Sequence, residues 1–157
     1  LTLWNRLVPH LSFPLRKQKM GIIIFMTDFL REVEKPKVLI LGYSYKANVG
    51  DTRETPVEPL ASHLKEGGCE VLIHDPLVDV RDLPSWVESV SEPTKCDDLD
   101  LIILATFHGE YNFNNELWKS MFSQMKVARV YDGRRVLPKD EMISYGWEYY
   151  GVGNPNS

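Results

Sequence analysis

Cysteine is scarce in this sequence, and long apolar runs are absent from it. Only two of the 157 residues are cysteines, Cys69 and Cys96, and neither belongs to a Cys-x-x-Cys motif or a Cys/His cluster. The ligand spacings typical of zinc sites are therefore missing, and we expect no metal centre. Two thiols in an ordinary composition also fit a protein of the reducing cytoplasm.

The apolar stretch at 20–26 is too short to cross a membrane. It has about seven residues, whereas a membrane-spanning helix needs roughly 20. Lys17 and Lys19 precede it as in a signal peptide, but no small-residue cleavage pattern follows, and the charge of Asp28 comes soon afterwards. We therefore expect a helix over 14–34 with one buried face, and no membrane contact.

Neither sign of charge is in large excess. With 18 basic and 22 acidic residues, the net charge of −4 provides no basic surface for nucleic acid. Any anion site must therefore be local. The length and the 43% apolar content correspond to one soluble globular domain with a sizeable core.

Apolar runs alternate with segments of helical periodicity from residue 38 onward. We expect strands over 38–41, 70–73, 87–90, 99–105, 127–131 and 148–152, and helices over 57–66, 115–125 and 139–145. The continuous apolar run at 99–105 is typical of a strand buried on both faces. This order predicts an α/β fold: a Rossmann-like, doubly wound, mostly parallel sheet in a three-layer sandwich.

The glycine fingerprint of a dinucleotide site is also missing. Gly42 ends the first strand, but side chains follow where Gly-x-Gly-x-x-Gly would let a pyrophosphate approach the backbone. Asp75 ends the second strand, where a ribose-binding acid would lie. An Asp-Pro turn with a helix cap is the interpretation that we prefer for Asp75. The fold is therefore expected to lack an intact NAD site.

A loop of about a dozen residues after the first strand carries Lys46, Asp51 and Arg53. Ligands of open α/β sheets bind beyond the carboxyl ends of the strands, and two cations there beside a helix N-terminus favour a phosphate group. The alternative is an ordinary solvated loop. We expect Asp51 to hold the loop by bonding backbone amides or Arg53.

Two more strands end in polar residues at the same edge of the predicted sheet. Arg134 and Arg135 follow the strand predicted over 127–131, and paired guanidinium groups suit a diphosphate. One of them is expected to be structural and to bond Asp132 or a helix end. His108 follows 99–105, where it could bond a ligand phosphate or hydroxyl, but a lone histidine is weak evidence and we do not prefer this interpretation.

Three stretches together resemble one family. The segment 42–56 reads Gly-x-x-Tyr-Lys-x-x-x-x-Asp-Thr-Arg-Glu-Thr-Pro, 70–76 reads Glu-Val-Leu-Ile-His-Asp-Pro, and 131–137 reads Tyr-Asp-Gly-Arg-Arg-Val-Leu. In this order they resemble the C-terminal domain of the UDP-glucose/GDP-mannose dehydrogenases, from about residue 35 to the end. Those enzymes use NAD to oxidise the C6 alcohol of a nucleotide-linked hexose to a carboxylate, for example UDP-glucose to UDP-glucuronate.

The resemblance implies roles for particular residues. Tyr45, Lys46 and Arg135 match positions that contact the nucleotide sugar, with Arg135 preferred over Arg134. Tyr45 stands where the family usually has phenylalanine. Arg53 matches an arginine that reaches toward the phosphates of NAD. The resemblance favours UDP over GDP as the nucleotide of the ligand, and it leaves the identity of the sugar open.

The resemblance also implies how this chain relates to a whole enzyme. Residues 1–34 are expected to be a leader and the end of a connecting helix, and 35–157 the domain that holds UDP-hexose. The NAD-binding N-terminal domain and the catalytic cysteine motif are not found in this sequence. We therefore expect no catalytic residue here, a structural role for Cys69, and no activity without that N-terminal partner.

Two alternatives and one further partner stay open. The domain could act alone as a non-catalytic nucleotide-sugar binder or regulator. A CoA-binding or methyltransferase-like relative would leave Lys46, Arg53 and Arg135 unexplained. The apolar face over 22–29 is a candidate surface for a homodimer.

Overall fold

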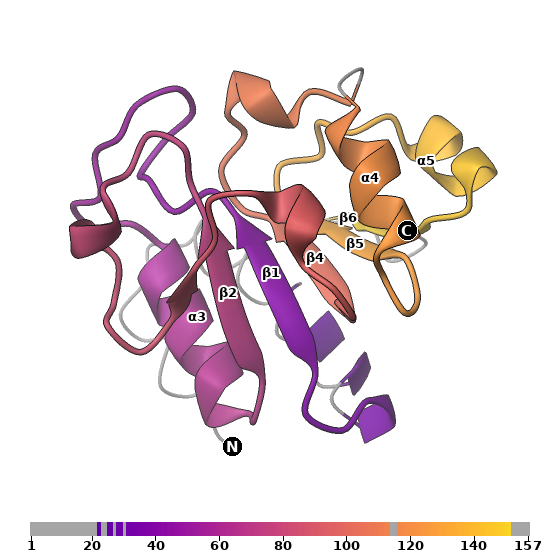
Figure 1. Cartoon of the computed structure of the whole chain (residues 1–157), viewed down its shortest axis with the longest axis horizontal. Coiled ribbons are helices and arrows are strands. Elements are labelled where there is room, and N and C mark those ends of the chain that lie inside the picture. The colour runs from indigo at the N-terminus through magenta and orange to yellow at the C-terminus, as the bar shows by residue number, and fades with distance from the viewer. Residues whose placement is uncertain (1–21, 23–24, 27, 30, 114–115, 152–157) are drawn as a thin grey trace.

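The computed structural model describes residues 22, 25–26, 28–29, 31–113 and 116–151. Within them lies one six-stranded sheet with the order β3-β2-β1-β4-β5-β6, in which every neighbouring pair is parallel (Figure 1). The strands are β1 (Lys37–Leu41), β2 (Glu70–His74), β3 (Glu88–Ser89), β4 (Leu101–Leu104), β5 (Arg129–Asp132) and β6 (Glu148–Gly151). The order reverses between β1 and β4, as in a doubly wound fold.

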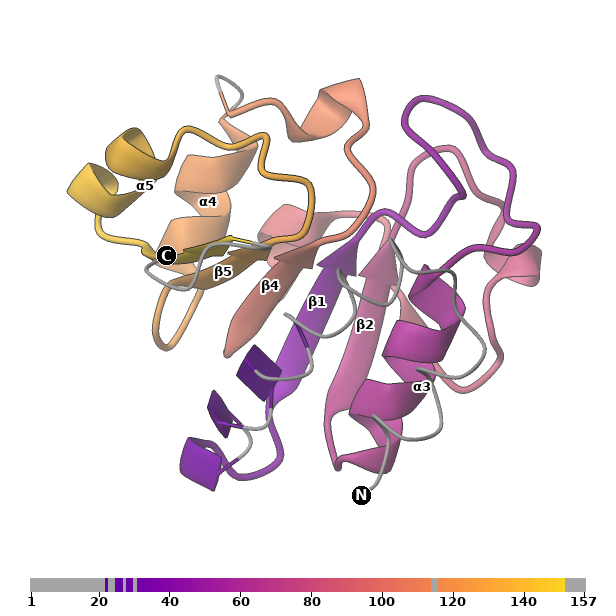
Figure 2. The ribbon, with the colours of Figure 1, turned by 180° about the vertical axis from the view of Figure 1, so that it is seen from behind.

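Helices cover both faces of this sheet. The α-helices are α3 (Val57–Glu66), α4 (Leu117–Ser123) and α5 (Lys139–Tyr145), and short 3-10 turns are η2 (Val80–Asp82), η3 (Pro93–Lys95) and η4 (Gly109–Tyr111). α3 and the described N-terminal helical residues lie on one face, and α4 lies on the other (Figures 1 and 2). The predicted three-layer α/β class is therefore confirmed.

Alternate residues of each central strand enter two separate cores. Val38 and Ile40 of β1 pack with α3 and the N-terminal helical residues, whereas Leu39 and Leu41 pack with α4 and α5. β4 divides in the same way, since Ile103 belongs to the first cluster and Ile102 to the second. Burial on both faces explains why these strands read as continuous apolar runs.

Most predicted elements are present, with shifted ends. The helices over 57–66 and 139–145 have their predicted bounds, whereas the strands predicted over 99–105 and 127–131 are Leu101–Leu104 and Arg129–Asp132. The strand predicted over 87–90 is reduced to the two exposed residues of β3, while the flanking Val87 and Val90 pack against the two cores without belonging to the strand. Residue 115 of the helix predicted over 115–125 and residue 152 of the last strand lie outside the described residues.

The N-terminal prediction can be compared only in part. Ile22, Phe25, Met26 and Phe29 are helical, with Ile22, Met26 and Phe29 buried in the first core, as the predicted apolar face requires. The leader over 1–21 lies outside the described residues. None of the helices in the described part of the chain has the length and apolar content to cross a membrane.

Gly42 brings the end of β1 against the end of β4. Its φ of +93° lies in the left-handed region, and a Cβ built there would be 2.5 Å from the carbonyl oxygen and from Cβ of Thr106. Glycine is therefore required at this position for both reasons. The close approach joins the loop after β1 to the loop after β4.

Candidate ligand-binding crest

The loops that follow β1, β2, β4 and β5 meet at one edge of the sheet, which we call the crest (Figure 1). It comprises residues 42–56, 75–77, 105–109 and 133–136. Because all strands are parallel, all their carboxyl ends lie at this edge, where open α/β sheets bind ligands. The structure thus places every residue predicted for the site on the same edge of the molecule.

Asp51 and Arg53 form a local ion pair inside the loop after β1. Oδ1 of Asp51 accepts from Nε and from the backbone N–H of Arg53, both at 3.0 Å, and Oδ2 accepts from a terminal guanidinium nitrogen at 2.8 Å. These hydrogen bonds lower the pKa of Asp51 to about 2. The predicted bond between Asp51 and Arg53 is confirmed, and the Arg53 side chain remains 88% exposed.

Tyr45 and Lys46 lie at the tip of the same loop. The backbone N–H of Tyr45 donates to the carbonyl of Asp51, which closes the loop, while the Tyr45 side chain is 55% exposed. Tyr45, Asp51, Arg53 and Glu54 line an open pocket of about 390 Å³. Lys46 is exposed beside Tyr45. Two of the predicted ligand-binding side chains, Tyr45 and Arg53, therefore share one pocket.

Asp75 lies beneath this loop with its carboxylate fully buried. Oδ2 accepts from the backbone N–H groups of Tyr43 at 2.7 Å and Ser44 at 3.0 Å, and from Nε2 of His108 at 2.9 Å. Oδ1 accepts from the N–H of Leu77 at 2.9 Å. The first turn after β1 thus directs its amides at a carboxylate of the chain itself.

The structure corrects the preferred interpretation of Asp75 in one respect. The predicted turn is present through the bond to Leu77, but Asp75 caps no helix, because η2 begins later and Asp79 caps it. The carboxylate instead accepts hydrogen bonds from the backbone of the turn that follows β1. His108 is 1% exposed and its ring bonds to the protein itself.

Burial and hydrogen bonding act in opposite directions on Asp75. Burial alone would raise its pKa, because it disfavours the charged form. The bonds from the amide of Tyr43, from His108 and from the amides of Leu77 and Ser44 lower the pKa, and they prevail. Asp75 is therefore held as a carboxylate.

The N-terminus of α3 offers less to an anion than the sequence suggests. Oγ1 of Thr55 donates to the carbonyl of Tyr43 and accepts from the N–H of Val57 at 3.2 Å, so one terminal donor of the helix is already used. Pro56 and Pro59 have no N–H at all. Binding of an anion at the crest must therefore rest mainly on side-chain cations.

The loop after β5 is organised by a second buried carboxylate. Asp132 is 0% exposed and accepts from the N–H of Arg134 at 3.1 Å, the N–H of Leu137 at 2.8 Å and the hydroxyl of Tyr149 at 2.8 Å. The predicted bond between an arginine of this motif and Asp132 is made by the backbone of Arg134.

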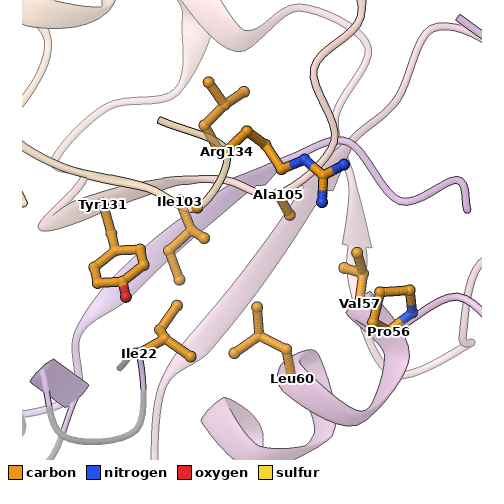
Figure 3. A pocket seen from close by; sticks show the side chains of 10 residues that line it. Ile22, Pro56, Val57, Leu60, Ile103, Ala105, Tyr131 and Arg134 are labelled. Carbon is orange, nitrogen blue, oxygen red and sulfur yellow. The ribbon is translucent and has the colours of Figure 1, made fainter. Parts of the chain in front are cut away.

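The two neighbouring arginines face different surroundings. Arg134 lines a small cavity of about 60 Å³ between α3 and the ends of β4 and β5, and its guanidinium group extends over Val57 (Figure 3). Arg135 has a φ of +55°, which turns the chain between the two side chains, and it does not line this cavity. The sequence showed no sign of this difference.

Tyr131 also lines this cavity. The residue is 3% exposed, and among the described atoms its hydroxyl has no hydrogen-bond partner. Burial raises the pKa of Tyr131 to about 12. The cavity therefore combines mostly apolar walls with the cationic side chain of Arg134.

Neither cysteine has the surroundings of a nucleophile. Cys69 and Cys96 are both buried and unpaired. Burial, followed by the charge of Asp100, raises the pKa of Cys69 to about 12, and burial also raises that of Cys96. A catalytic thiol needs the opposite shift. Within the described residues, no cluster of three metal-ligating side chains occurs.

Fold and crest together define a Rossmann-like domain that presents cations where α/β proteins bind phosphorylated ligands. Comparison with known proteins gives the family: the model of the UDP-glucose/GDP-mannose dehydrogenase family, UDP binding domain, matches residues 39–139. The chain belongs to this family, and the resemblance of its three motifs is confirmed.

Similar proteins are nucleotide-sugar dehydrogenases. The UDP-N-acetyl-D-mannosamine dehydrogenase of Methanocaldococcus jannaschii is 31% identical over 135 residues, covering 83% of this chain and 31% of that protein. The UDP-glucose 6-dehydrogenase of Rickettsia bellii is 28% identical over 128 residues, covering 78% of this chain and 29% of that protein. The crystal structure of the NDP-N-acetyl-D-galactosaminuronic acid dehydrogenase from Methanosarcina mazei superposes with a TM-score of 0.71 at 26% identity. The match covers 87% of this chain and 29% of that protein. The chain thus spans about 30% of the length of these relatives.

Proposed function

We propose that this chain is the UDP-sugar-binding part of a cytoplasmic, NAD-dependent nucleotide-sugar 6-dehydrogenase, which oxidises a sugar C6 alcohol to a carboxylate. The observation that carries the proposal is the crest, where Lys46 and Arg53 from one loop and the Arg134–Arg135 pair from another face the same edge of a family-matched fold. Several cations at one edge suit a diphosphate that carries two negative charges.

Within this proposal, Tyr45 packs on the nucleotide sugar and Lys46 binds its oxygen atoms. One arginine of the second loop grips the diphosphate. The resemblance favoured Arg135, whereas the position of the side chain favours Arg134, because its guanidinium group lies near Pro56 and Val57 at the start of α3 (Figure 3). We give Arg134 the main contact and Arg135 the smaller one. Arg53, exposed at the rim, is the residue proposed to reach toward the phosphates of NAD.

The crest does not fit NAD as a resident cofactor. In a dinucleotide site the amides after the first strand bind pyrophosphate, whereas here those of Tyr43 and Ser44 are bound to Asp75. NAD would therefore be held mainly by a separate N-terminal domain, which is the partner that we propose. This chain alone is expected to be inactive. A homodimer stays a proposal, but not through the apolar face over 22–29, because Ile22, Met26 and Phe29 are buried in the first core of the chain itself.

A calorimetric titration tests the binding role. The chain is titrated with UDP-glucose, with UDP-N-acetylmannosamine and with NAD, and the Lys46→Ala variant serves as the matched control. We expect binding of a UDP-sugar that weakens in Lys46→Ala, and no comparable binding of NAD. Binding of NAD in preference to every UDP-sugar, or equal affinity in both proteins, would contradict the proposal.

The enzymatic role needs a separate test. The chain is mixed with a separately produced NAD-binding half of a related enzyme, and NADH formation is followed with UDP-glucose. Activity that requires both parts supports a dehydrogenase half. Nucleotide-sugar binding without activity in any such mixture would favour the alternative, a stand-alone binding or regulatory domain.

A further inference from the structure

The tip of the loop after β1 is tied to the crest on both sides of its exposed residues. Before the tip, the carbonyl of Ser44 accepts from Oγ1 of Thr106 at 2.9 Å. After the tip, Oδ1 of Asn48 accepts from the N–H of Gly109 at 2.9 Å. The side chains of Tyr45 and Lys46 lie between these two attachments. They are exposed on a stretch of backbone that is held at both ends.

His108 is the residue that joins both sides. Its Nδ1 accepts from the backbone N–H of Asn48 at 2.8 Å, and its Nε2 lies 2.9 Å from Oδ2 of Asp75 and 3.2 Å from Oγ of Ser44. Because the N–H of Asn48 is a donor, Nδ1 must be the acceptor. The ring is therefore the tautomer with hydrogen on Nε2.

The remaining bonds agree with this tautomer. Nε2–H is shared between two acceptors, the carboxylate of Asp75 and Oγ of Ser44. The Ser44 hydroxyl then donates its own hydrogen to the carbonyl of Lys46 at 3.1 Å. Every donor in the chain of bonds meets an acceptor, so the network is complete.

The same geometry excludes a hydrolytic triad. In a triad, the serine and the carboxylate bond to different nitrogens of the histidine. Here both Ser44 and Asp75 approach Nε2, and the histidine is 1% exposed. His108 cannot activate Ser44 toward an external substrate and must act on the loop instead.

We propose that His108 and Asp75 are positioning residues for nucleotide-sugar binding, and that they hold Tyr45 and Lys46 in the binding conformation before the ligand arrives. This inference rests on the proposed function. A loop that is already ordered loses less conformational entropy on binding, so its contacts contribute more to affinity. The network thus affects affinity without touching the ligand.

Four variants separate this role from general stability. His108→Phe keeps an aromatic ring but removes all three polar contacts, those with Asn48, Asp75 and Ser44. His108→Asn keeps an acceptor near the position of Nδ1, and His108→Gln keeps a donor near that of Nε2. His74→Phe is the matched control, because His74 is also a buried histidine, and it bonds to Tyr111 at 2.8 Å rather than to the loop tip.

Three measurements are made on the whole chain. Calorimetry gives the affinity for UDP-glucose, hydrogen exchange gives the protection of the amides at 43–51, and ¹⁵N NMR of histidine gives the tautomer. We expect a native Nε2–H tautomer and about tenfold weaker binding in His108→Phe, the scale set by two side chains that must be ordered again. Exchange should rise at 43–51, with partial recovery in His108→Asn or His108→Gln and no loss of affinity in His74→Phe.

The outcomes separate this inference from the function on which it rests. Equal affinity in the native chain and His108→Phe would overturn the positioning role while leaving the function intact. Exchange that rises across the whole sheet would also overturn it, since the histidine would then be merely structural. If the native chain binds no UDP-sugar, the proposed function fails, and unchanged exchange at 43–51 in His108→Phe would then reject the network as well. Loss of amide protection confined to 43–51 would instead support the ordering of the loop by His108.

Discussion

The hydroxyl of Tyr149 donates a 2.8 Å hydrogen bond to the buried carboxylate of Asp132. Tyr149 belongs to β6 and Asp132 ends β5, so the last strand fixes the loop that carries the two arginines. Burial, and then the bond and charge of Asp132, raise the pKa of Tyr149. The same strand pair that completes the sheet therefore also orders the crest.

Two tyrosine substitutions should have different effects on the free energy of unfolding. Tyr149→Phe removes a donor from a buried carboxylate and should cost about 2 kcal/mol. Tyr131→Phe removes a buried hydroxyl that has no partner among the described atoms, and should leave stability unchanged or raise it. Urea unfolding of both variants checks this, and a similar loss in both would contradict it.

Two glycine substitutions should differ although both positions have positive φ. Gly42→Ala adds strain and places Cβ 2.5 Å from backbone and side-chain atoms of Thr106, so we expect a loss of more than about 3 kcal/mol. Gly68 has a φ of +95° with open space around it, and Gly68→Ala should cost only about 1 kcal/mol. Thermal unfolding compares them. Equal losses would show that close packing at Gly42 adds nothing.

Asp75 should contribute to stability in a pH-dependent way. Its pKa is lowered in the folded protein, so its contribution is present above the ordinary value near 4 and is lost as the pH falls through the folded value. Asp75→Asn should cost about 2 kcal/mol at neutral pH. The difference in free energy of unfolding between this variant and the native chain should become smaller below about pH 4. A gap that is constant with pH would contradict this assignment.

The arginine pair can be separated by affinity for UDP-glucose. Arg134→Ala should weaken binding by about tenfold or more, as expected for a charged hydrogen bond to a diphosphate, and Arg135→Ala by less. Arg134→Lys should restore only part of the affinity, because an ammonium group cannot form the bidentate contact. The reverse order of the two alanine variants would return the main contact to Arg135.

Cys69 should be unreactive in the folded chain. With its pKa raised to about 12, very little thiolate is present at pH 8. A thiol-specific reagent such as DTNB should label it slowly in buffer and rapidly in denaturant. Fast labelling of the native protein would contradict the structural role. Cys69→Ser serves to assign the signal, since Cys96 is the other thiol.

Much of the fold could be predicted because its signals are local. The apolar runs of β1, β2 and β4 mark strands that helices cover on both sides. Thr55-Pro56 precedes α3 and Gly67-Gly68 follows it, and both pairs are common boundary residues of helices. β3 was overestimated because its two exposed residues have no periodic pattern that defines their length. The order of apolar and polar residues therefore predicts the length of a strand only where the strand is buried along its whole length.

The site was predicted less completely because its contacts join distant segments. The predicted contact between Asp51 and Arg53, two positions apart, is confirmed. By contrast, His108 meets Ser44 across 64 positions, and no periodicity indicates such a pair. Arg134 and Arg135 are neighbours in the sequence, which gave no sign of the φ of +55° at Arg135. Only the folded chain places these groups.

The parallel direction of all six strands also separates the molecule into two chemically different ends. The crest carries the proposed ligand contacts, whereas the opposite end carries turns such as Gly67-Gly68, which is exposed and has open space at Gly68. Attachment of a surface linker or dye at that turn should therefore leave the crest facing solution. The domain is suited to immobilised binding assays in a single defined orientation.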